Sequence, residues 1–349
     1  MGKWKAAVVG CGKPRTSYAG VKQGFAVGYQ HGEAYDVHPD VDLVAAVDVS
    51  PENLHAFCEK FNVPRGYADF EEMLSEEKPD LVSVCTWPRM HKDMVLAAAR
   101  AGAKGIFCEK PMAVTYADCV EMHETCKSLG VVLNVAHQRR YDFDYVEAKK
   151  AIDRGDIGNV LRMEAWVGDG WDMMSWGTHW VDMMLYLNGD VLPRNVIAQA
   201  DVSSRKIHYQ HPVEDQIVIQ IQFDNGVLGV IHMRPDRVEP GNIVVGDGGL
   251  ILLPDKNGDL SIFTDSGRNV LKKPEGYVFG IGHHRAVEEL IKAIETGKPS
   301  QLDSASALVT MQIIMAAYES ARTSRVVRMP FEEPGHPLET WYEELAAKA

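Results

Sequence analysis

The first residues whose spacing points to chemistry are glycines that follow a strand-like run. Residues 5–12 read KAAVVGCG, so an apolar segment leads directly into Gly10 and Gly12. A glycine loop between a buried strand and a helix lets the backbone approach a pyrophosphate, which the N–H groups at the helix start then bind. The complete pattern is G-x-G-x-x-G, but position 15 is Arg, so a third glycine has to lie elsewhere.

Gly28 can serve as the third glycine. It opens the segment GYQHGEAYDVHPDVDLVAAVDVSPE, which predicts a helix, a short connection and a strand ending in an acid, Asp48. Residues 13–27 then form an insertion, thirteen residues longer than the two residues that would suffice. Without those thirteen, the 38 residues from Gly10 to Asp48 become 25, close to the roughly 20 expected for the acid that binds the ribose 2′-OH.

The nucleotide that this pattern indicates is NAD. Val49 and Ser50 follow Asp48, so no Arg stands there to accept the 2′-phosphate of NADP. Lys13 and Arg15, at the insertion, can nevertheless reach a phosphate. The simpler interpretation is that GCG forms an ordinary turn after a buried strand. The combination of strand, glycines, helix and spaced acid favours nucleotide binding instead.

The elements around this loop predict a two-domain α/β protein divided near residue 140. The first part alternates continuous apolar runs with helical segments, which predicts a doubly wound parallel sheet covered on both faces. The second part predicts an antiparallel or mixed sheet with helices, because VIQIQF at 218–223 alternates strictly. The expected strands are 5–10, 42–48, 80–86, 104–110 and 131–137 in the first part, and 194–202, 215–223, 226–233, 242–246, 249–253 and 259–263 in the second.

Composition narrows the class of protein. The 349 residues are 46% apolar, enough for two cores, and carry a net charge of −13 without a basic run. We therefore expect neither nucleic acid nor a membrane among the partners. The six cysteines contain no C-x-x-C pair, which predicts free thiols, and the chain shows no signal-peptide pattern and no run of 18 apolar residues. The expected location is the cytoplasm.

A triplet at 109–111 connects the chain to a known family. Glu109, Lys110 and Pro111 follow the fifth predicted strand, and E-K-P at this place resembles the Gfo/Idh/MocA family of NAD(P)-dependent oxidoreductases. The resemblance covers nearly the whole chain. The further motifs that carry it are TWPRMH at 86–91, QRRYD at 138–142, GTHxxD at 177–182 and VEDQIVIQIQFDNGVLG at 213–229.

This resemblance implies a fold and an activity. The expected fold is an NAD-binding Rossmann domain over 1–140 and an α+β domain over 141–349 for substrate binding and oligomerisation, with an open, mostly antiparallel sheet. The active site is expected between the two domains. The implied reaction is hydride transfer between nicotinamide and a hydroxyl carbon of a small carbohydrate, a sugar or cyclitol. The resemblance also implies a homo-oligomer, either a dimer or a tetramer.

Two residues carry the proton chemistry that this reaction needs. Lys110 lies just past the carboxyl end of a parallel strand, where it can touch the substrate hydroxyl and the cofactor ribose. We expect nearby NAD⁺ to lower the pKa of its ammonium group and Glu109 to hold the lysine in place. His179 matches the family's catalytic histidine, whose neutral imidazole takes the hydroxyl proton as hydride leaves carbon. Asp182, one turn later, either orients His179 or forms an ion pair elsewhere.

The chain departs from the family four residues before His179. Many members have Asp there, but this chain has Ser175, whose hydroxyl cannot act as a carboxylate. Asp172, one helical turn earlier, is the expected substitute. The other expected site residues are Trp171 and Trp176 as a sugar platform or as core residues, Arg139 and Tyr141 near the substrate, Trp87, Pro88 and His91 beside the cofactor, and Tyr277, His283 and His284 as pocket lining or loop packing.

Three interpretations of function stay open. The first is an NAD-dependent dehydrogenase that oxidises a ring hydroxyl of a sugar, glycoside or cyclitol. The second is a redox-assisted glycosidase, which oxidises the sugar with tightly held NAD⁺, eliminates the aglycone, adds water and reduces the sugar again. The third is a non-catalytic NAD-binding sensor, which the presence of both Lys110 and His179 disfavours.

A metal site is not expected from the sequence. His179 and Asp182 have one ligand-like spacing, and His208, His211 and His232 occur nearby. These residues form no pattern of three fixed ligands, which a protein metal site requires.

Overall fold

The computed structural model describes residues 3–13, 27–168, 171–234, 241–254, 258–277 and 282–347. The chain forms two units: unit 1 is Met1–Ala113, Asp118–Gln138 and Gly280–Ala305, and unit 2 is Val114–Ala117, Arg139–Phe279 and Ser306–Ala349. The segment 280–305 therefore belongs to unit 1, although one division after residue 140 would assign it to the second domain. The functional division into 1–140 and 141–349 stays a prediction.

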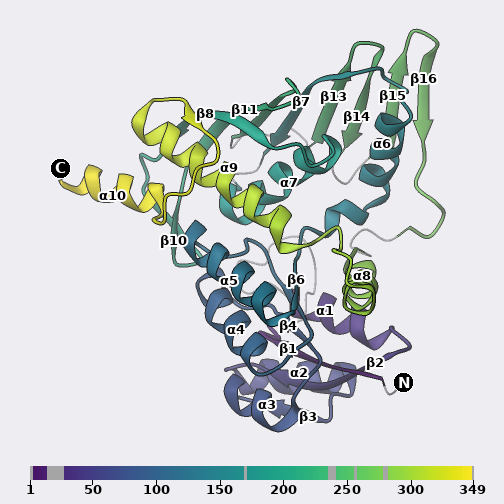
Figure 1. Ribbon diagram of the computed structural model, residues 1–349, viewed down its shortest axis with the longest axis vertical. Helices are drawn as coiled ribbons and strands as arrows, with labels where there is room; N and C mark the ends of the chain where they lie inside the picture. Colours follow the sequence, from purple (N-terminus) through teal and green to yellow (C-terminus); the bar gives the residue numbers. More distant parts are fainter. Residues whose placement is uncertain are drawn as a thin grey trace. The chain divides into compact units, whose positions relative to one another are not determined.

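Unit 1 contains the doubly wound sheet that the sequence predicts (Figure 1). Its strands are parallel and lie in the order β3-β2-β1-β4-β5-β6. Their bounds are β1 Trp4–Val9, β2 Val41–Val47, β3 Arg65–Tyr67, β4 Leu81–Val84, β5 Gly105–Cys108 and β6 Val132–Val135. β4 and β5 are buried along their whole length, as expected for strands covered on both faces. β3 departs from expectation, because RGY contains no apolar run.

Helices connect these strands. They are α1 Val27–Asp36, α2 Pro51–Phe61, α3 Phe70–Glu77, α4 Pro88–Arg100 and α5 Tyr116–Leu129, with α8 Gly282–Thr296 added from later in the chain. At the start of α2, the Ser50 side chain accepts a hydrogen bond from the Asn53 N–H and Pro51 takes the first helical position. The strand order reverses between β1 and β4, and sheets of this kind bind ligands at the carboxyl ends of such strands.

Two glycines allow β1 and α1 to meet at this place. Gly10 follows β1 with φ +85°, and a Cβ there would lie 2.8 Å from the carbonyl carbon and oxygen of Cys85. Gly28 lies in the first turn of α1, where a Cβ would be 2.7 Å from the carbonyl oxygens of Gly10 and Cys11. The start of α1 therefore touches the backbone of the glycine loop directly. Most of the predicted insertion, residues 14–26 with Arg15, lies outside the described residues.

Unit 2 is built on a larger sheet, of mixed and mostly antiparallel strands, as predicted. Its order is β16-β15-β14-β13-β7-β12-β11-β8-β17, and only β7 and β12 pair in parallel among these described strands. The bounds are β7 Val160–Val167, β8 Pro193–Asp201, β11 Gln216–Phe223, β12 Leu228–Met233, β13 Gly241–Gly246, β14 Gly249–Pro254, β15 Leu260–Thr264, β16 Gly267–Leu271 and β17 Val327–Arg328. Two short strands, β9 Lys206–His208 and β10 His211–Val213, form a separate pair.

Helices of unit 2 cover one face of this sheet (Figure 1). They are α6 Phe143–Asp153, α7 Thr178–Leu187 and α9 Ser304–Thr323, whereas α10 Pro337–Ala347 contacts β10. A 3-10 turn at Gln138–Tyr141 precedes α6, and a π-helix at Met173–Gly177 precedes α7. Ser320 of α9 accepts a hydrogen bond from the Ala198 N–H of β8, at 2.9 Å. Ile197 and Leu228, 42% and 37% exposed, lie at outward positions of the sheet, and the homo-oligomer implied by the resemblance stays a prediction.

The structure also describes the state of the cysteines and the character of the helices. All six cysteines are free, as predicted. Among the helices of the described ranges, none has the length and apolar character needed to cross a membrane.

The contact at Gly28 predicts the effect of adding one methyl group. We expect Gly28→Ala to lower the free energy of unfolding by about 1–3 kcal/mol, because the new Cβ meets backbone oxygens that cannot rotate away. Urea unfolding followed by circular dichroism measures this loss. The matched control is Gly335→Ala, since Gly335 is exposed and has open space around its Cβ position. Equal stability of the two variants would contradict the prediction.

Candidate active site

The glycine loop holds the predicted ribose-binding acid in a defined orientation. Asp48, directly after β2, accepts hydrogen bonds from the Gly12 N–H to Oδ2 at 3.0 Å and from the Ser50 N–H to Oδ1 at 2.8 Å. A carboxylate offers about four lone-pair directions, so each oxygen of Asp48 retains capacity for a further donor such as a ribose hydroxyl. Lys13, at the start of the insertion, is exposed beside this loop.

His91 connects the loop after β4 with the loop that contains Lys110. The ring is buried on α4, with Nδ1 3.0 Å from the Pro111 carbonyl oxygen and Nε2 3.0 Å from that of Thr86. Because both ring nitrogens face backbone carbonyls, His91 supports these loops through their main chain. Trp87 and Pro88 precede it at the start of α4, and the Trp87 side chain is 44% exposed.

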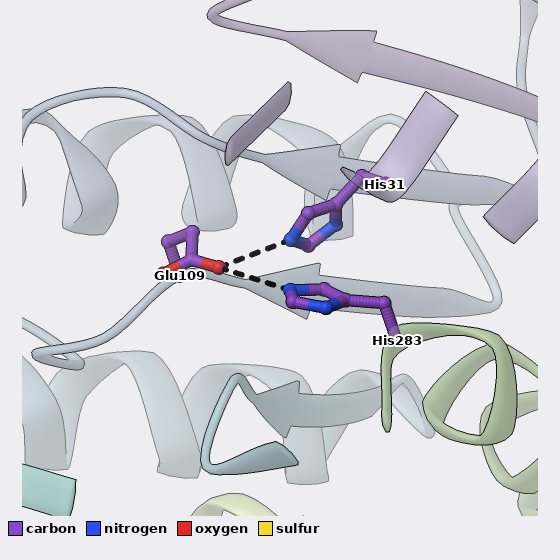
Figure 2. Close-up of side chains that lie close together, drawn as sticks. All are labelled: His31, Glu109 and His283. Carbon is purple, nitrogen blue, oxygen red and sulfur yellow. Dashed lines mark hydrogen bonds and ion pairs between the residues drawn. The ribbon is translucent and has the colours of Figure 1, made fainter. Parts of the chain in front are cut away.

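Glu109 is buried at the end of β5 and fixes the backbone of Lys110. Its Oε2 accepts a hydrogen bond from the Lys110 N–H at 3.2 Å. Its Oε1 lies 3.2 Å from Nε2 of His31 and 3.7 Å from Nε2 of His283 (Figure 2). Burial alone would raise the pKa of Glu109, but the two histidines and the charge of Lys110 outweigh it and hold the pKa well below its usual range. Glu109 is therefore a buried anion.

In unit 2, four of the residues predicted from the sequence lie together. His179, in the first turn of α7, is 2% exposed, and its ring centroid lies 5.6 Å from that of Trp176. Trp171 packs edge-on against Trp176 at 5.0 Å. The guanidinium of Arg139 lies 5.1 Å from the ring centroids of both Trp176 and Trp180, at cation–π distance. Tyr141, two residues after Arg139, is also buried.

Asp182 forms an ion pair, one of the two alternatives that the sequence left open. Both of its carboxylate oxygens accept hydrogen bonds from Arg140, at 2.8 to 3.2 Å. Asp182 is fully buried, and Arg140 also reaches Asp190. Sequence reasoning missed Arg140, because QRRYD contains no sign of which of two adjacent arginines points inward.

Asp172 begins the π-helix instead of lying in a regular helix. It accepts hydrogen bonds from the Ser175 N–H at 2.6 Å and from the Ser175 hydroxyl at 2.5 Å. Its Oδ2 also lies 3.0 Å from Nδ1 of His208, whose side chain is half exposed. Within the described residues its hydrogen bonds thus go to Ser175 and His208. Burial raises the pKa of Asp172, but these hydrogen bonds outweigh burial and leave the pKa below its ordinary value.

Glu214 is a second buried acid in this region, and no motif in the sequence singles it out. Its Oε1 accepts a hydrogen bond from the Met173 N–H at 2.7 Å, and its Oε2 lies 2.7 Å from the Tyr318 hydroxyl. Burial, followed by the charge of Asp172, raises the pKa of Glu214 to about 7. Asp172 takes the histidine partner, so Glu214 is the acid of the pair that holds a proton near neutral pH.

Comparisons with known proteins identify the class to which this fold and these residues belong. A family model described as "Oxidoreductase family, NAD-binding Rossmann fold" matches residues 5–137, and one described as "GFO/IDH/MocA C-terminal domain" matches residues 145–250. The chain belongs to the Gfo/Idh/MocA family of NAD(P)-binding oxidoreductases.

Several relatives are named as dehydrogenases of small carbohydrates. The chain is 27% identical to a myo-inositol 2-dehydrogenase of Thermotoga maritima over 87% of its length and 96% of that protein. It is 25% identical to a D-glucoside 3-dehydrogenase of Escherichia coli over 86% of its length and 93% of that protein. A solved structure of levoglucosan dehydrogenase in complex with NADH shares the fold, with a TM-score of 0.81, 21% identity, and coverage of 94% and 99% of the two chains.

The proton held by Glu214 predicts a pH dependence of stability. The folded protein keeps this proton up to about pH 7, whereas the unfolded chain releases it near the ordinary pKa of 4.5. The free energy of unfolding should therefore fall, by on the order of 3 kcal/mol, as pH rises between these values. Glu214→Gln mimics the protonated acid, so it should remove this decline and be more stable than the wild type at pH 8.

Urea unfolding of the wild type and of Glu214→Gln at pH 5, 6, 7 and 8 measures the difference. The two proteins should differ little at pH 5, diverge steadily between pH 5 and pH 7, and keep a constant difference above pH 7. Glu332→Gln, at an exposed acid, serves as the control and should follow the wild type. Parallel curves for the wild type and Glu214→Gln would show that Glu214 is already ionised at pH 5.

Proposed function

We propose that this protein is an NAD-dependent dehydrogenase that oxidises a ring hydroxyl of a sugar, glycoside or cyclitol. The observation that carries the proposal is the placement of Lys110 at the carboxyl end of β5, with its N–H held by the buried Glu109 carboxylate. Doubly wound sheets bind their ligands at this end of the strands. The carbohydrate dehydrogenases among the relatives support the substrate class.

The residues of unit 1 fit a dinucleotide. A Cβ at Gly28 would lie 2.7 Å from the carbonyl oxygens of Gly10 and Cys11, so this glycine lets the start of α1 pack closely on the loop, as the third glycine of a dinucleotide-binding turn does. Asp48 offers its remaining lone pairs to ribose hydroxyls. When bound, the nicotinamide supplies a hydride acceptor, and the protein has to manage only binding, orientation and one proton.

In this proposal, Lys110 and His179 handle the proton of the substrate hydroxyl. Oxidation of an alcohol removes a hydride from carbon and a proton from oxygen, so a base has to accept the hydroxyl proton. We assign that role to the imidazole of His179 and assign to Lys110 the orientation of the same hydroxyl and a share in relaying the proton. Trp171 and Trp176 offer aromatic faces to the C–H faces of a sugar ring, and Arg139 offers hydrogen-bond donors to its hydroxyls.

The redox-assisted glycosidase remains the second candidate, since the hydroxyl of Ser175 stands where many members of the family have an Asp. It would use the same oxidation and return the hydride to the product. The two reactions differ in stoichiometry: a dehydrogenase accumulates one NADH per substrate consumed, whereas the glycosidase releases aglycone without net NADH. Retention of a proton-handling lysine and histidine disfavours a non-catalytic sensor.

The first test is therefore a measurement of NADH and aglycone in the same reaction. Purified protein is incubated with NAD⁺ and a panel of aryl glycosides, free sugars and cyclitols. NADH that rises in step with substrate loss supports the dehydrogenase. Aglycone release without NADH, abolished when bound NAD⁺ is stripped, would favour the glycosidase instead.

A substitution of the lysine tests its role in the reaction. Lys110→Met should lower kcat by about 10²–10⁴-fold while NAD binding changes little. Lys298→Met, at an exposed lysine of unit 1, should leave kcat unchanged.

The preference for NAD yields a second prediction. The Asp48 carboxylate, held beside the glycine loop, should repel the 2′-phosphate of NADP and bind the free 2′-OH of NAD. Asp48→Ser should therefore weaken binding of NAD⁺ and improve binding of NADP⁺, shifting the ratio of dissociation constants at least tenfold toward NADP⁺. Calorimetric titration with NAD⁺ and with NADP⁺ measures the ratio. An unchanged ratio would place the selectivity elsewhere, with Lys13 as the next candidate.

A further inference from the structure

Two histidines and one carboxylate meet inside unit 1. His31 comes from α1, Glu109 from the end of β5 and His283 from the first turn of α8, and Figure 2 shows both imidazole rings facing the carboxylate. The three residues are 0%, 6% and 1% exposed. One nitrogen of each ring and one oxygen of the carboxylate lie within 4.8 Å of one another. Three strong ligand atoms are therefore gathered in a space closed to bulk solvent.

The hydrogen bonds behind His31 let its Nε2 face Glu109 as a metal ligand. The Ser83 hydroxyl donates to the Tyr35 hydroxyl at 2.9 Å and lies 2.8 Å from Nδ1 of His31. When Nδ1 of His31 donates to Ser83, Nε2 of the neutral imidazole carries the lone pair that a metal ion binds. In the other tautomer, Nε2 donates to the Glu109 oxygen 3.2 Å away. The same geometry thus holds the Glu109 anion by a hydrogen bond without a metal and by a shared metal ion when one binds.

The distances suit a small tetrahedral cation. Zinc bound to nitrogen and oxygen at about 2.0–2.1 Å in a tetrahedron separates neighbouring ligand atoms by roughly 3.3 Å. Oε1 of Glu109 lies 3.2 Å from Nε2 of His31 and 3.7 Å from Nε2 of His283, on either side of that value. A hydrogen bond from the second nitrogen of a ligating histidine is also usual at metal sites, and Ser83 accepts it for His31.

We propose that His31, Glu109 and His283 bind one divalent transition-metal ion, zinc. Imidazole and carboxylate together suit zinc among the common metals, and three protein ligands leave one tetrahedral position for water. The sequence does not predict this site, because the three ligands lie on separate elements far apart in the chain. Of the three, the sequence pattern marks His283 only as pocket lining or loop packing and Glu109 only as the partner of Lys110.

The metal would have a structural role: it would bind beside Lys110 without taking part in the reaction. One oxygen of Glu109 would bind the metal while the other continues to accept the hydrogen bond from the Lys110 N–H. The metal would thereby tie α1 and α8 to the backbone of Lys110. Its loss should lower thermal stability and leave the lysine less well positioned, whichever reaction the protein catalyses.

The experiment begins with the wild-type protein. The protein is stripped with a chelator, dialysed, and titrated with Zn²⁺ by calorimetry, with metal content measured by mass spectrometry and melting temperature recorded before and after. We expect one zinc per chain with micromolar or tighter affinity and a rise in melting temperature. Failure to bind zinc, or binding that leaves the melting temperature unchanged, would overturn the proposal and leave a simple hydrogen bond between His31 and Glu109.

Variants then locate the metal. His31→Gln and His283→Gln should each weaken zinc binding at least tenfold and abolish the rise in melting temperature. His123→Gln is the matched control, because His123 belongs to unit 1 but lies outside the cluster, with its Nδ1 2.8 Å from the Ser304 hydroxyl. Equal zinc binding by all three variants would place the metal elsewhere and overturn the proposal.

A spectroscopic measurement on the wild type keeps the test valid if a variant misfolds. X-ray absorption of the zinc-loaded protein should show nitrogen and oxygen ligands only, with the scattering of two imidazoles. The Co²⁺-substituted protein should show the intense visible bands of tetrahedral cobalt. Sulfur scattering would instead point to the free cysteines, and six-coordinate cobalt to adventitious surface binding, and either result would contradict the assignment.

Discussion

The buried charge of Glu109 is the constraint on which much of unit 1 depends. An ionised carboxylate removed from water costs several kcal/mol unless neighbouring groups compensate for it. The compensation comes from three directions: the His31 ring on α1, the His283 ring on α8 and the N–H of Lys110. These groups together keep the acid charged, so the positions of two helices and of one loop bear on a single side chain. The return of the chain to unit 1 at 280–305 is part of this compensation.

In unit 2, two buried acids lie close together, and the pKa of one is lowered while that of the other is raised. Asp172 and Glu214 lie close enough for the charge of one to raise the pKa of the other, and of these two acids it is Asp172 that has His208 as a partner. Two like charges in a dry site cannot both be stabilised, so the acid with the weaker set of partners keeps its proton. The protonated Glu214 can then bridge Met173 and Tyr318. The π-helix that carries Trp176 and ends next to His179 is thus held by one charged acid and one neutral acid.

The sequence was informative where structure depends on local pattern. Continuous apolar runs predicted the parallel sheet, and strict alternation in VIQIQF predicted a half-buried strand. It failed where a feature depends on residues brought together by folding. His31 and Glu109 are 78 residues apart, and no periodicity links them. Glu214 stands just before a predicted strand, and only the fold brings its charge close to that of Asp172.

Because of the π-helix, counting residues back from His179 does not show which side chain lies one turn before it. The Gly177 N–H bonds to the Asp172 carbonyl at 3.1 Å, five residues earlier, so this turn holds one more residue than an α-helical turn. A position four residues before His179 does not lie one turn above it in such a segment. Ser175 lies within this segment and is hydrogen-bonded to Asp172, so the start of the π-helix at Asp172 sets the orientation of the segment.

One helix links the proposed cofactor site to the lysine. Gly28 and His31 are three residues apart on α1, which separates them by about 4.5 Å along the helix axis. Gly28 touches the glycine loop, and His31, within the same turn, touches Glu109, whose other oxygen holds Lys110. An α-helical turn is stiff, so a ligand that presses on the start of α1 acts on an element that also bears on Glu109. The binding of a dinucleotide and the placement of the lysine would then be properties of one rigid turn, and a cation bound between His31 and Glu109 would hold the acid to that turn more firmly.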